Sequence, residues 1–122
     1  MLVAELVTTS AAVAATRSRL AKVAALADCL RRAAPDEIAI VVSYLSGELR
    51  QRRSGVGWAA LRDLPPPAAA PSLEVAEVDR SFARIEAATG PGSSAVRREE
   101  LAQLFARATV GCSARWSAAS CT

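Results

Sequence analysis

The sequence contains no histidine, and only five of its 122 residues are aromatic: two Trp, one Tyr and two Phe. An imidazole is the side chain that most often acts as a general base or binds a transition metal near neutral pH. Its absence excludes most hydrolase mechanisms and every zinc site that needs histidine. With so few aromatic rings, the core has to consist mainly of Leu, Val, Ile and Ala side chains.

Cysteine is also scarce. Cys29, Cys112 and Cys121 are odd in number and far apart in the sequence, which fits neither a disulfide framework nor a C-x-x-C zinc site. No metal site is therefore expected, and a reducing cytoplasm is the simplest location. The first ten residues lack the basic region of a secretion signal, and no run of eighteen uncharged apolar residues occurs. We expect neither export nor a membrane span.

Alanine and arginine, by contrast, are abundant. The chain holds 28 alanines and 14 arginines against a single lysine, and Ala, Leu and Arg are strong helix formers. Its length of 122 residues suits one domain. The sequence predicts an all-α fold, a helical bundle of about five helices in two groups joined by the proline-rich spacer 65–72. The expected helices are 3–15, 16–33, 38–49, 74–87 and 95–109.

Apolar residues at helical spacing predict the buried face of each helix. Thr16 is the expected N-cap of the second helix, and Ser93 or Ser94 that of the last. Gly47 is expected to weaken the last turn of the third helix, which gives way to a loop near there, and Cys29 is expected to be a small buried side chain. The expected core positions are Leu20, Val23, Ala27 and Leu30 in the second helix, Ile38, Val41, Val42, Leu45 and Leu49 in the third, Val75, Val78, Phe82 and Ile85 in the fourth, and Leu101, Leu104, Phe105 and Ala108 in the fifth.

The net charge is only +3, but the cations are grouped along the chain. Spaced cationic groups suit a polyanion such as nucleic acid, and they are also typical of a plain solvated surface. Charge alone leaves both interpretations open. The groups are Arg17, Arg19 and Lys22, then Arg50, Arg52 and Arg53, and finally Arg97 and Arg98.

Four short patterns follow one another: S-R-L-A-K-V at 18–23, Y-L-S-G-E-L followed by G-V-G within 44–57, the proline spacer, and G-S-S at 92–94. With them, the stretches 16–67 and 73–109 resemble the N-terminal DNA-binding domain of ATP-dependent DNA ligases, in the compact bacterial form of mycobacteria and relatives. The resemblance implies an all-helical domain that holds duplex DNA around a nick from the minor-groove side, in DNA repair, replication or recombination.

The resemblance also implies which residues face the DNA. Arg19 matches a position directed at the DNA backbone, with Arg17 and Lys22 in support on the same helix. The loop before the last helix contributes Gly92, Ser93, Ser94, Arg97 and Arg98, and Arg50, Arg52 and Arg53 form a third group. Glycine permits close approach to a phosphate chain, and helix starts add N–H donors. Other interpretations stay open: Ser93 and Ser94 as helix caps, Trp58 as a packing anchor, and Arg19 in a surface ion pair.

The chemistry of a ligase is missing from the chain. A ligase forms a lysyl-adenylate on the lysine of a K-x-D-G motif, using ATP and Mg²⁺, whereas Lys22 is the only lysine and is followed by VAALA. No catalytic residue, metal ligand or cofactor is therefore expected in this chain, and the catalytic domain of a ligase would be its partner. A helical protein-interaction module and a gene fragment without function are the alternatives.

The last thirteen residues differ in character from the rest. Beyond Thr109, VGCSARWSAASCT has no helical stripe, although the resemblance implies a further helix there. If the DNA that encodes this tail is read in a frame shifted by two nucleotides, its possible codons permit apolar residues at the spacing of that helix. We therefore expect a ligase-type DNA-binding domain at 1–109, incomplete at its C-terminal side, and an unstructured or frameshifted tail at 110–122. Loss of that helix should leave the apolar faces of the last two helices partly uncovered and lead to marginal stability or self-association.

Overall fold

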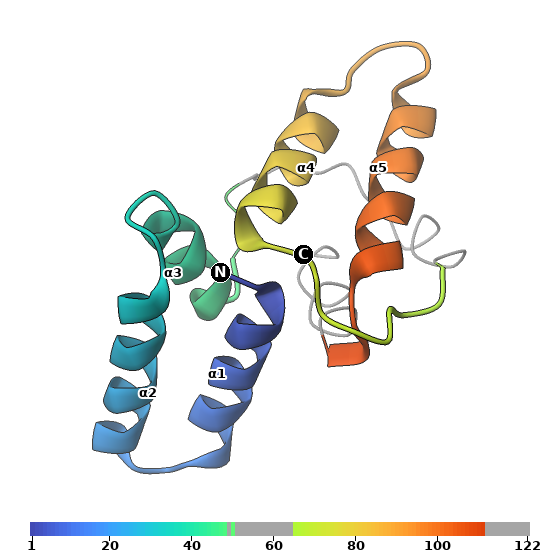
Figure 1. Cartoon of the computed structure of the whole chain (residues 1–122). Coiled ribbons are helices and arrows are strands. Elements are labelled where there is room, and N and C mark those ends of the chain that lie inside the picture. The colour runs from blue at the N-terminus through green and yellow to red at the C-terminus, as the bar shows by residue number, and fades with distance from the viewer. Residues whose placement is uncertain (49, 51–64, 112–122) are drawn as a thin grey trace.

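The computed structural model describes residues 1–48, 50 and 65–111 (Figure 1). The described residues form five helices: α1 (Val3–Ala15), α2 (Arg19–Arg32), α3 (Ile38–Ser46), α4 (Val75–Ala87) and α5 (Ser93–Arg107). The one strand-like feature in this part of the chain is an isolated bridge between Leu2 and Glu74. The predicted all-α fold is confirmed, and the predicted first helix has the observed bounds.

The helices form two antiparallel hairpins that meet at a central junction (Figure 1). α1 packs against α2, α4 packs against α5, and α3 contacts both α1 and α4. The turn between α1 and α2 lies at one end of the molecule in Figure 1, and the turn between α4 and α5 lies at the other. The spacer is held against the second hairpin, because the Ala68 amide donates a 2.8 Å hydrogen bond to the carbonyl of Ala108.

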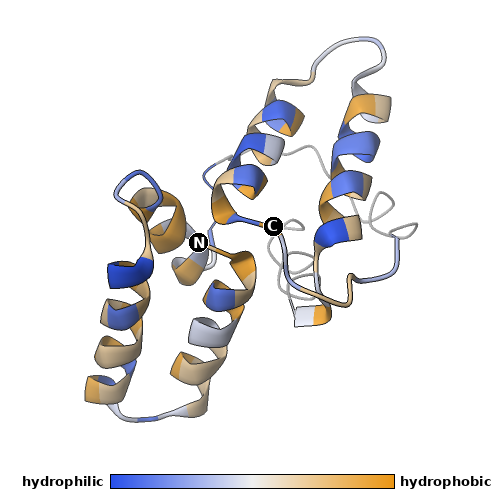
Figure 2. Cartoon of the chain, in the orientation of Figure 1, coloured by the Kyte–Doolittle hydropathy of each residue, from blue (hydrophilic) through white to orange (hydrophobic). Residues whose placement is uncertain are grey.

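One hydrophobic core joins the two hairpins, and hydrophobic segments occur on all five helices (Figure 2). Its largest fully buried side chains are aliphatic, except for Phe82 of α4 and Phe105 of α5. Cys29 is fully buried at the end of α2, as predicted. The apolar faces predicted for α4 and α5 are confirmed, because all eight residues predicted as core positions of the fourth and fifth helices are buried.

Those two helices also correct an expectation. Leu101, Leu104 and Phe105 are no more than 3% exposed, and Phe82 and Ile85 are fully buried. The apolar faces predicted to be uncovered are therefore covered, because α4 and α5 pack on each other and α4 packs on α3. Uncovered apolar faces of these helices thus give no reason for marginal stability or self-association.

The predicted faces of α2 and α3 are partly wrong. Leu20 is 83% exposed and Val23 is 56% exposed. The side of α2 that turns toward the core includes the half-buried Lys22 and Leu26 and the buried Cys29, each one residue before a predicted core position. An alanine-rich helix has small apolar residues on several faces, so spacing fixes its period better than its orientation. In α3, Ile38 and Val42 are also exposed, and Ile40, Val41 and Tyr44 are buried instead; Leu49 lies outside the described residues.

The helix ends differ from the expected caps. Ser18 caps α2, because its hydroxyl accepts a hydrogen bond from the Ala21 amide at 3.2 Å, whereas the Thr16 hydroxyl accepts from the amide of Ser18. α5 begins after Gly92, whose φ of 82° is left-handed, and no side chain caps it. Gly47 ends α3 with a φ of 87°, as expected from its position.

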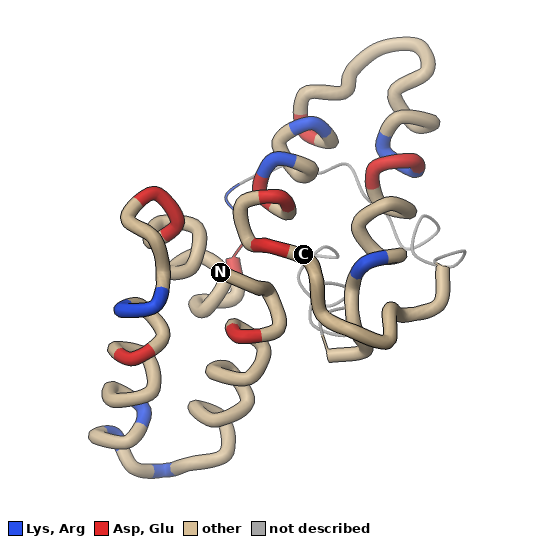
Figure 3. The backbone as a smooth tube through the Cα atoms, in the orientation of Figure 1, with Lys and Arg blue, Asp and Glu red and all other residues tan. Residues whose placement is uncertain are grey.

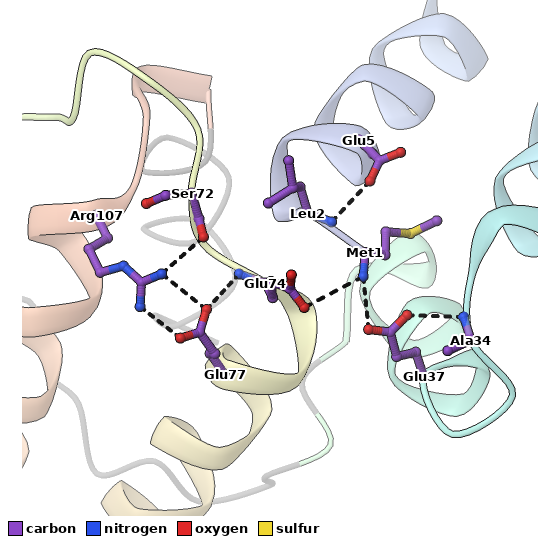
Figure 4. A network of polar contacts seen from close by, with 9 residues as sticks. All are labelled: Met1, Leu2, Glu5, Ala34, Glu37, Ser72, Glu74, Glu77 and Arg107. Carbon is purple, nitrogen blue, oxygen red and sulfur yellow. Dashed lines mark hydrogen bonds and ion pairs between the residues drawn. The ribbon is translucent and has the colours of Figure 1, made fainter.

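The start of the chain ties α1, α3 and α4 together (Figure 4). The Met1 ammonium donates to Oε1 of Glu37 at 2.8 Å and lies 3.9 Å from Oε2 of Glu74. Glu37 also accepts from the Ala34 amide at 3.0 Å, and the amide of Val75 donates to the Met1 carbonyl at 3.0 Å. The hydrogen bond between the Met1 ammonium and the Glu37 carboxylate raises the pKa of the ammonium and lowers the pKa of Glu37. This junction fixes the two hairpins relative to each other.

Candidate nucleic-acid interface

The first basic group surrounds the turn between α1 and α2. Arg17 precedes the helix, Arg19 is its first residue and Lys22 lies in its first turn. Both arginines are exposed, Lys22 is half-buried, and none of the three forms a hydrogen bond or ion pair through its side chain within the described residues. The turn itself is ordered by the hydroxyls of Thr16 and Ser18.

The position of these cations is electrostatically unfavourable for folding. A helix N-terminus carries partial positive charge and is stabilised by acidic side chains, yet the first turn of α2 contains no acidic residue. Arg19 and Lys22 therefore add positive charge to an end that is already positive. Such a combination concentrates the potential that attracts an anion.

The second basic group lies at the start of α5. Gly90 and Gly92 both have left-handed φ angles, which bring the chain around from α4, and α5 also has no acidic residue in its first turn. Arg98 is exposed and unpaired within the described part of the chain, but Nη2 of Arg97 donates to the Ala88 carbonyl at 2.6 Å. The two guanidinium groups therefore have different environments.

Neither serine of the G-S-S pattern is an N-cap. Ser93 and Ser94 are the first two residues of α5, and Gly92 is the residue that precedes it. The cap interpretation is wrong because the left-handed Gly92 takes that place, so both serines stand at the uncapped start of the helix. The amide of Ser93 donates to the Gly90 carbonyl at 3.2 Å, so of the two serine amides that of Ser94 remains to donate to an anion.

The two basic groups are not brought together (Figure 3). Arg17, Arg19 and Lys22 lie at one end of the first hairpin, and Ser93, Ser94 and Arg98 lie at the opposite end of the second. In both helices the first turn lacks acidic residues. An exposed arginine lies in that turn in α2 (Arg19) and in the following turn in α5 (Arg98). Any single ligand that contacts both groups has to be long.

The third group is described only in part. Arg50 is paired with Asp79 of α4, with Nη1 and Oδ2 3.2 Å apart. That contact holds the segment after α3 against α4. Arg52 and Arg53, together with Gly55, Gly57 and Trp58, lie outside the described residues.

Three arginines that the sequence did not single out line a cleft between α4 and α5. The cleft has a volume of about 550 Å³, and Arg80, Arg84 and Arg107 are among its lining residues. They are scattered among acidic residues, so no basic cluster is visible in the sequence. The one available signal was the i, i+4 spacing of Arg80 and Arg84, which places both on one face of a helix.

No three acidic or cysteine side chains in the described ranges come together in a way that could hold a metal ion. No helix in the described part of the chain is long and apolar enough to cross a membrane.

The chain was compared with known proteins. It is 62% identical over 109 residues to a probable DNA ligase of Beutenbergia cavernae, covering 89% of this chain and 21% of that protein. This chain is related to bacterial DNA ligases. Probable DNA ligases of Mycobacterium avium and Kineococcus radiotolerans are 59% and 56% identical over 111 and 119 residues, covering 89% and 95% of this chain. The resemblance inferred from the sequence patterns is confirmed.

The ligase-related chain spans only 21% to 24% of the length of these relatives. No protein-family model matches it, and no solved structure matches it. The assignment to the ligases therefore rests on sequence identity to curated relatives.

Proposed function

We propose that this chain is the DNA-binding part of an ATP-dependent DNA ligase and holds duplex DNA around a nick through the phosphate backbone, whatever the base sequence. The observation that carries the proposal is the 54% to 62% identity to probable DNA ligases over 89% of the chain. The exposed cations in the first turn of α2 and the second turn of α5 support it, since cationic side chains near the N–H donors of a helix start suit phosphate oxygens.

The contacts expected of this domain are electrostatic. The proposed phosphate-binding groups are Arg17, Arg19 and Lys22 at the start of α2, and Arg98 with the amide of Ser94 near the start of α5. The amide of Ser93 is not among them, because it donates to the Gly90 carbonyl at 3.2 Å. Arg52 and Arg53 would add to them. With three to five phosphate contacts, the logarithm of the binding constant should fall with the logarithm of salt concentration with a slope of roughly −3 to −5.

Catalysis would belong to another part of the ligase. The only lysine, Lys22, lacks the Asp and Gly of a K-x-D-G motif, so ATP and Mg²⁺ would act in the catalytic domain and not here. This chain would contribute affinity and position, and the whole enzyme would work in the cytoplasm at the nucleoid.

Fluorescence anisotropy with a labelled nicked duplex over a salt series tests the proposal. Arg19→Ala should weaken binding to a similar degree for unrelated sequences and reduce the steepness of the salt dependence by about 1. Arg31→Ala, which removes an exposed arginine at the other end of α2, is the matched control and should bind as the parent chain does. Absence of salt-dependent binding, or a change in base preference, would contradict the proposal.

A second function, a helical protein-interaction module, is favoured by the apolar side chains exposed at the start of α2. Leu20 and Val23 are 83% and 56% exposed one turn apart, and exposed apolar neighbours can receive a partner helix. Leu104 and Phe105 are buried and cannot serve as such a surface. Partner binding that survives high salt and is lost in Leu20→Ser would favour this function over DNA binding.

A further inference from the structure

We infer that the cleft between α4 and α5 is a phosphate-binding site, separate from the two helix starts. The inference extends the proposed function, because a DNA backbone is one source of the phosphate. Arg80 and Arg84 stand one turn apart on α4, Arg107 lies in the last turn of α5, and all three line the cleft. Figure 3 shows the basic segments of both helices.

The cleft has an excess of positive charge. Its lining residues include three arginines and a single acidic residue, Glu77. Glu100, just outside the lining, neutralises part of this excess through Arg84. Arg80 is exposed and makes no hydrogen bond or ion pair within the described residues. Its charge still acts on Glu77, where it is the weakest of the causes that lower the pKa of that carboxylate.

The other two guanidinium groups are held in fixed orientations. Nε and Nη2 of Arg84 donate to the two carboxylate oxygens of Glu100 at 2.8 and 3.0 Å. Nη1 and Nη2 of Arg107 donate to Glu77 at 2.8 and 3.1 Å, and Nη2 also donates to the Ser72 carbonyl (Figure 4). Paired guanidinium groups have already lost the rotamer freedom that ligand binding would otherwise remove.

Each paired arginine keeps unused donors. Within the described residues, Nη1 of Arg84 and Nε of Arg107 make no hydrogen bond. These N–H groups and the whole fork of Arg80 provide several donors around a cleft of about 550 Å³. Guanidinium groups match the tetrahedral oxygens of phosphate, with charge-assisted hydrogen bonds that are about twice as strong as neutral ones.

The cleft and Arg98 lie on different faces of α5. The cleft is lined by Gln103, Leu104 and Arg107, and Arg98 is nine residues, or two and a half turns, before Arg107 along the helix. One phosphate cannot contact both. The cleft would therefore bind either a second stretch of DNA backbone or a free phosphate compound.

Titration with inorganic phosphate at constant ionic strength, followed by NMR of the arginine Nε–Hε groups, tests the site. The signals of Arg80, Arg84 and Arg107 should shift together and saturate. Arg80→Gln should abolish the saturable shift, Arg80→Lys should retain part of it, and the control Arg31→Gln should retain all of it. A thermal melt of each variant checks that the exposed substitutions leave the fold intact.

Binding of a nicked duplex separates the two sources of phosphate. If Arg80→Gln weakens DNA binding and reduces the salt slope by about 1, the DNA backbone occupies the cleft. If phosphate shifts saturate and DNA binding is unchanged in Arg80→Gln, the ligand is a free phosphate compound. Saturable phosphate shifts in a chain that binds no DNA would refute the proposed function and retain the site. Absence of saturable shifts, with normal DNA binding by Arg80→Gln, would refute the site alone; absence of both shifts and DNA binding would refute both.

Discussion

Arg97 donates a 2.6 Å hydrogen bond from Nη2 to the carbonyl of Ala88, the C-cap residue that follows α4. Its neighbour Arg98 points to solvent with no partner in the described part of the chain. Two adjacent arginines thus have different roles in the turn between α4 and α5. Arg97 closes the turn from inside, and Arg98 is exposed on its outside.

These roles predict different binding defects. Arg98→Gln should remove one phosphate contact and reduce the slope of the salt dependence by about 1. Arg97→Lys keeps the charge but loses the planar donor, so the affinity should fall while the slope stays close to that of the parent chain. Anisotropy titrations over a salt series measure both quantities. A smaller slope for Arg97→Lys would mean that Arg97 contacts phosphate directly.

Ser18→Ala should lower the free energy of unfolding by about 1 kcal/mol, because it removes the hydroxyl that accepts from the Ala21 amide at the start of α2. Ser46→Ala, which alters an exposed hydroxyl bonded to the Ser43 carbonyl, is a control for the loss of a surface serine. Urea unfolding of the three proteins measures the difference. Equal stability of Ser18→Ala and the parent chain would show that the cap adds nothing.

Phe82→Ala should lower the free energy of unfolding by about 3 to 5 kcal/mol, since its ring is fully buried in the core. Leu20→Ala should change it by less than about 0.5 kcal/mol, since Leu20 is 83% exposed. Both replace a large apolar residue by alanine, so the contrast isolates burial. Urea unfolding provides the measurement, and a large effect of Leu20→Ala would mean that the side chain is covered in solution.

Stability should fall in acid. Hydrogen bonds from the Met1 ammonium, Arg107 and Arg84 lower the pKa of Glu37, Glu77 and Glu100 from an ordinary value of 4.5. A carboxylate with a lowered folded pKa stabilises the fold above its unfolded value and loses that contribution as the pH falls through the folded value.

Thermal melts from pH 7 to pH 2 should therefore show stability decreasing below about pH 4.5. Glu37→Gln should reduce this dependence, and the exposed Glu48→Gln should not. The raised pKa of the Met1 ammonium acts on the alkaline side, where stability should fall as the pH rises above 8 and through the folded value. An acid profile of Glu37→Gln identical to that of the parent chain would rule out the role given to Glu37.

The sequence predicted α4 and α5 well because their large apolar residues recur on one face each. It oriented α2 wrongly because alanine on several faces weakens the pattern, and the side chains of Leu20 and Val23 were placed in the core by spacing alone. The helix starts that carry Arg19 and Arg98 could be found from local patterns. The cleft of Arg80, Arg84 and Arg107 could not, because it depends on how two helices pack.

If the chain binds DNA as proposed, the separation of the two cationic turns sets a minimum length for a duplex that contacts both. α2 and α5 contain 14 and 15 residues, so each helix is roughly 21 to 22 Å long at about 1.5 Å per residue. Two such lengths placed end to end would span about a dozen base pairs of duplex at about 3.4 Å per pair, which is an upper estimate of the span between the turns. On the proposed function, a short duplex would contact one turn at a time, and the affinity would rise sharply once the duplex is long enough to contact both.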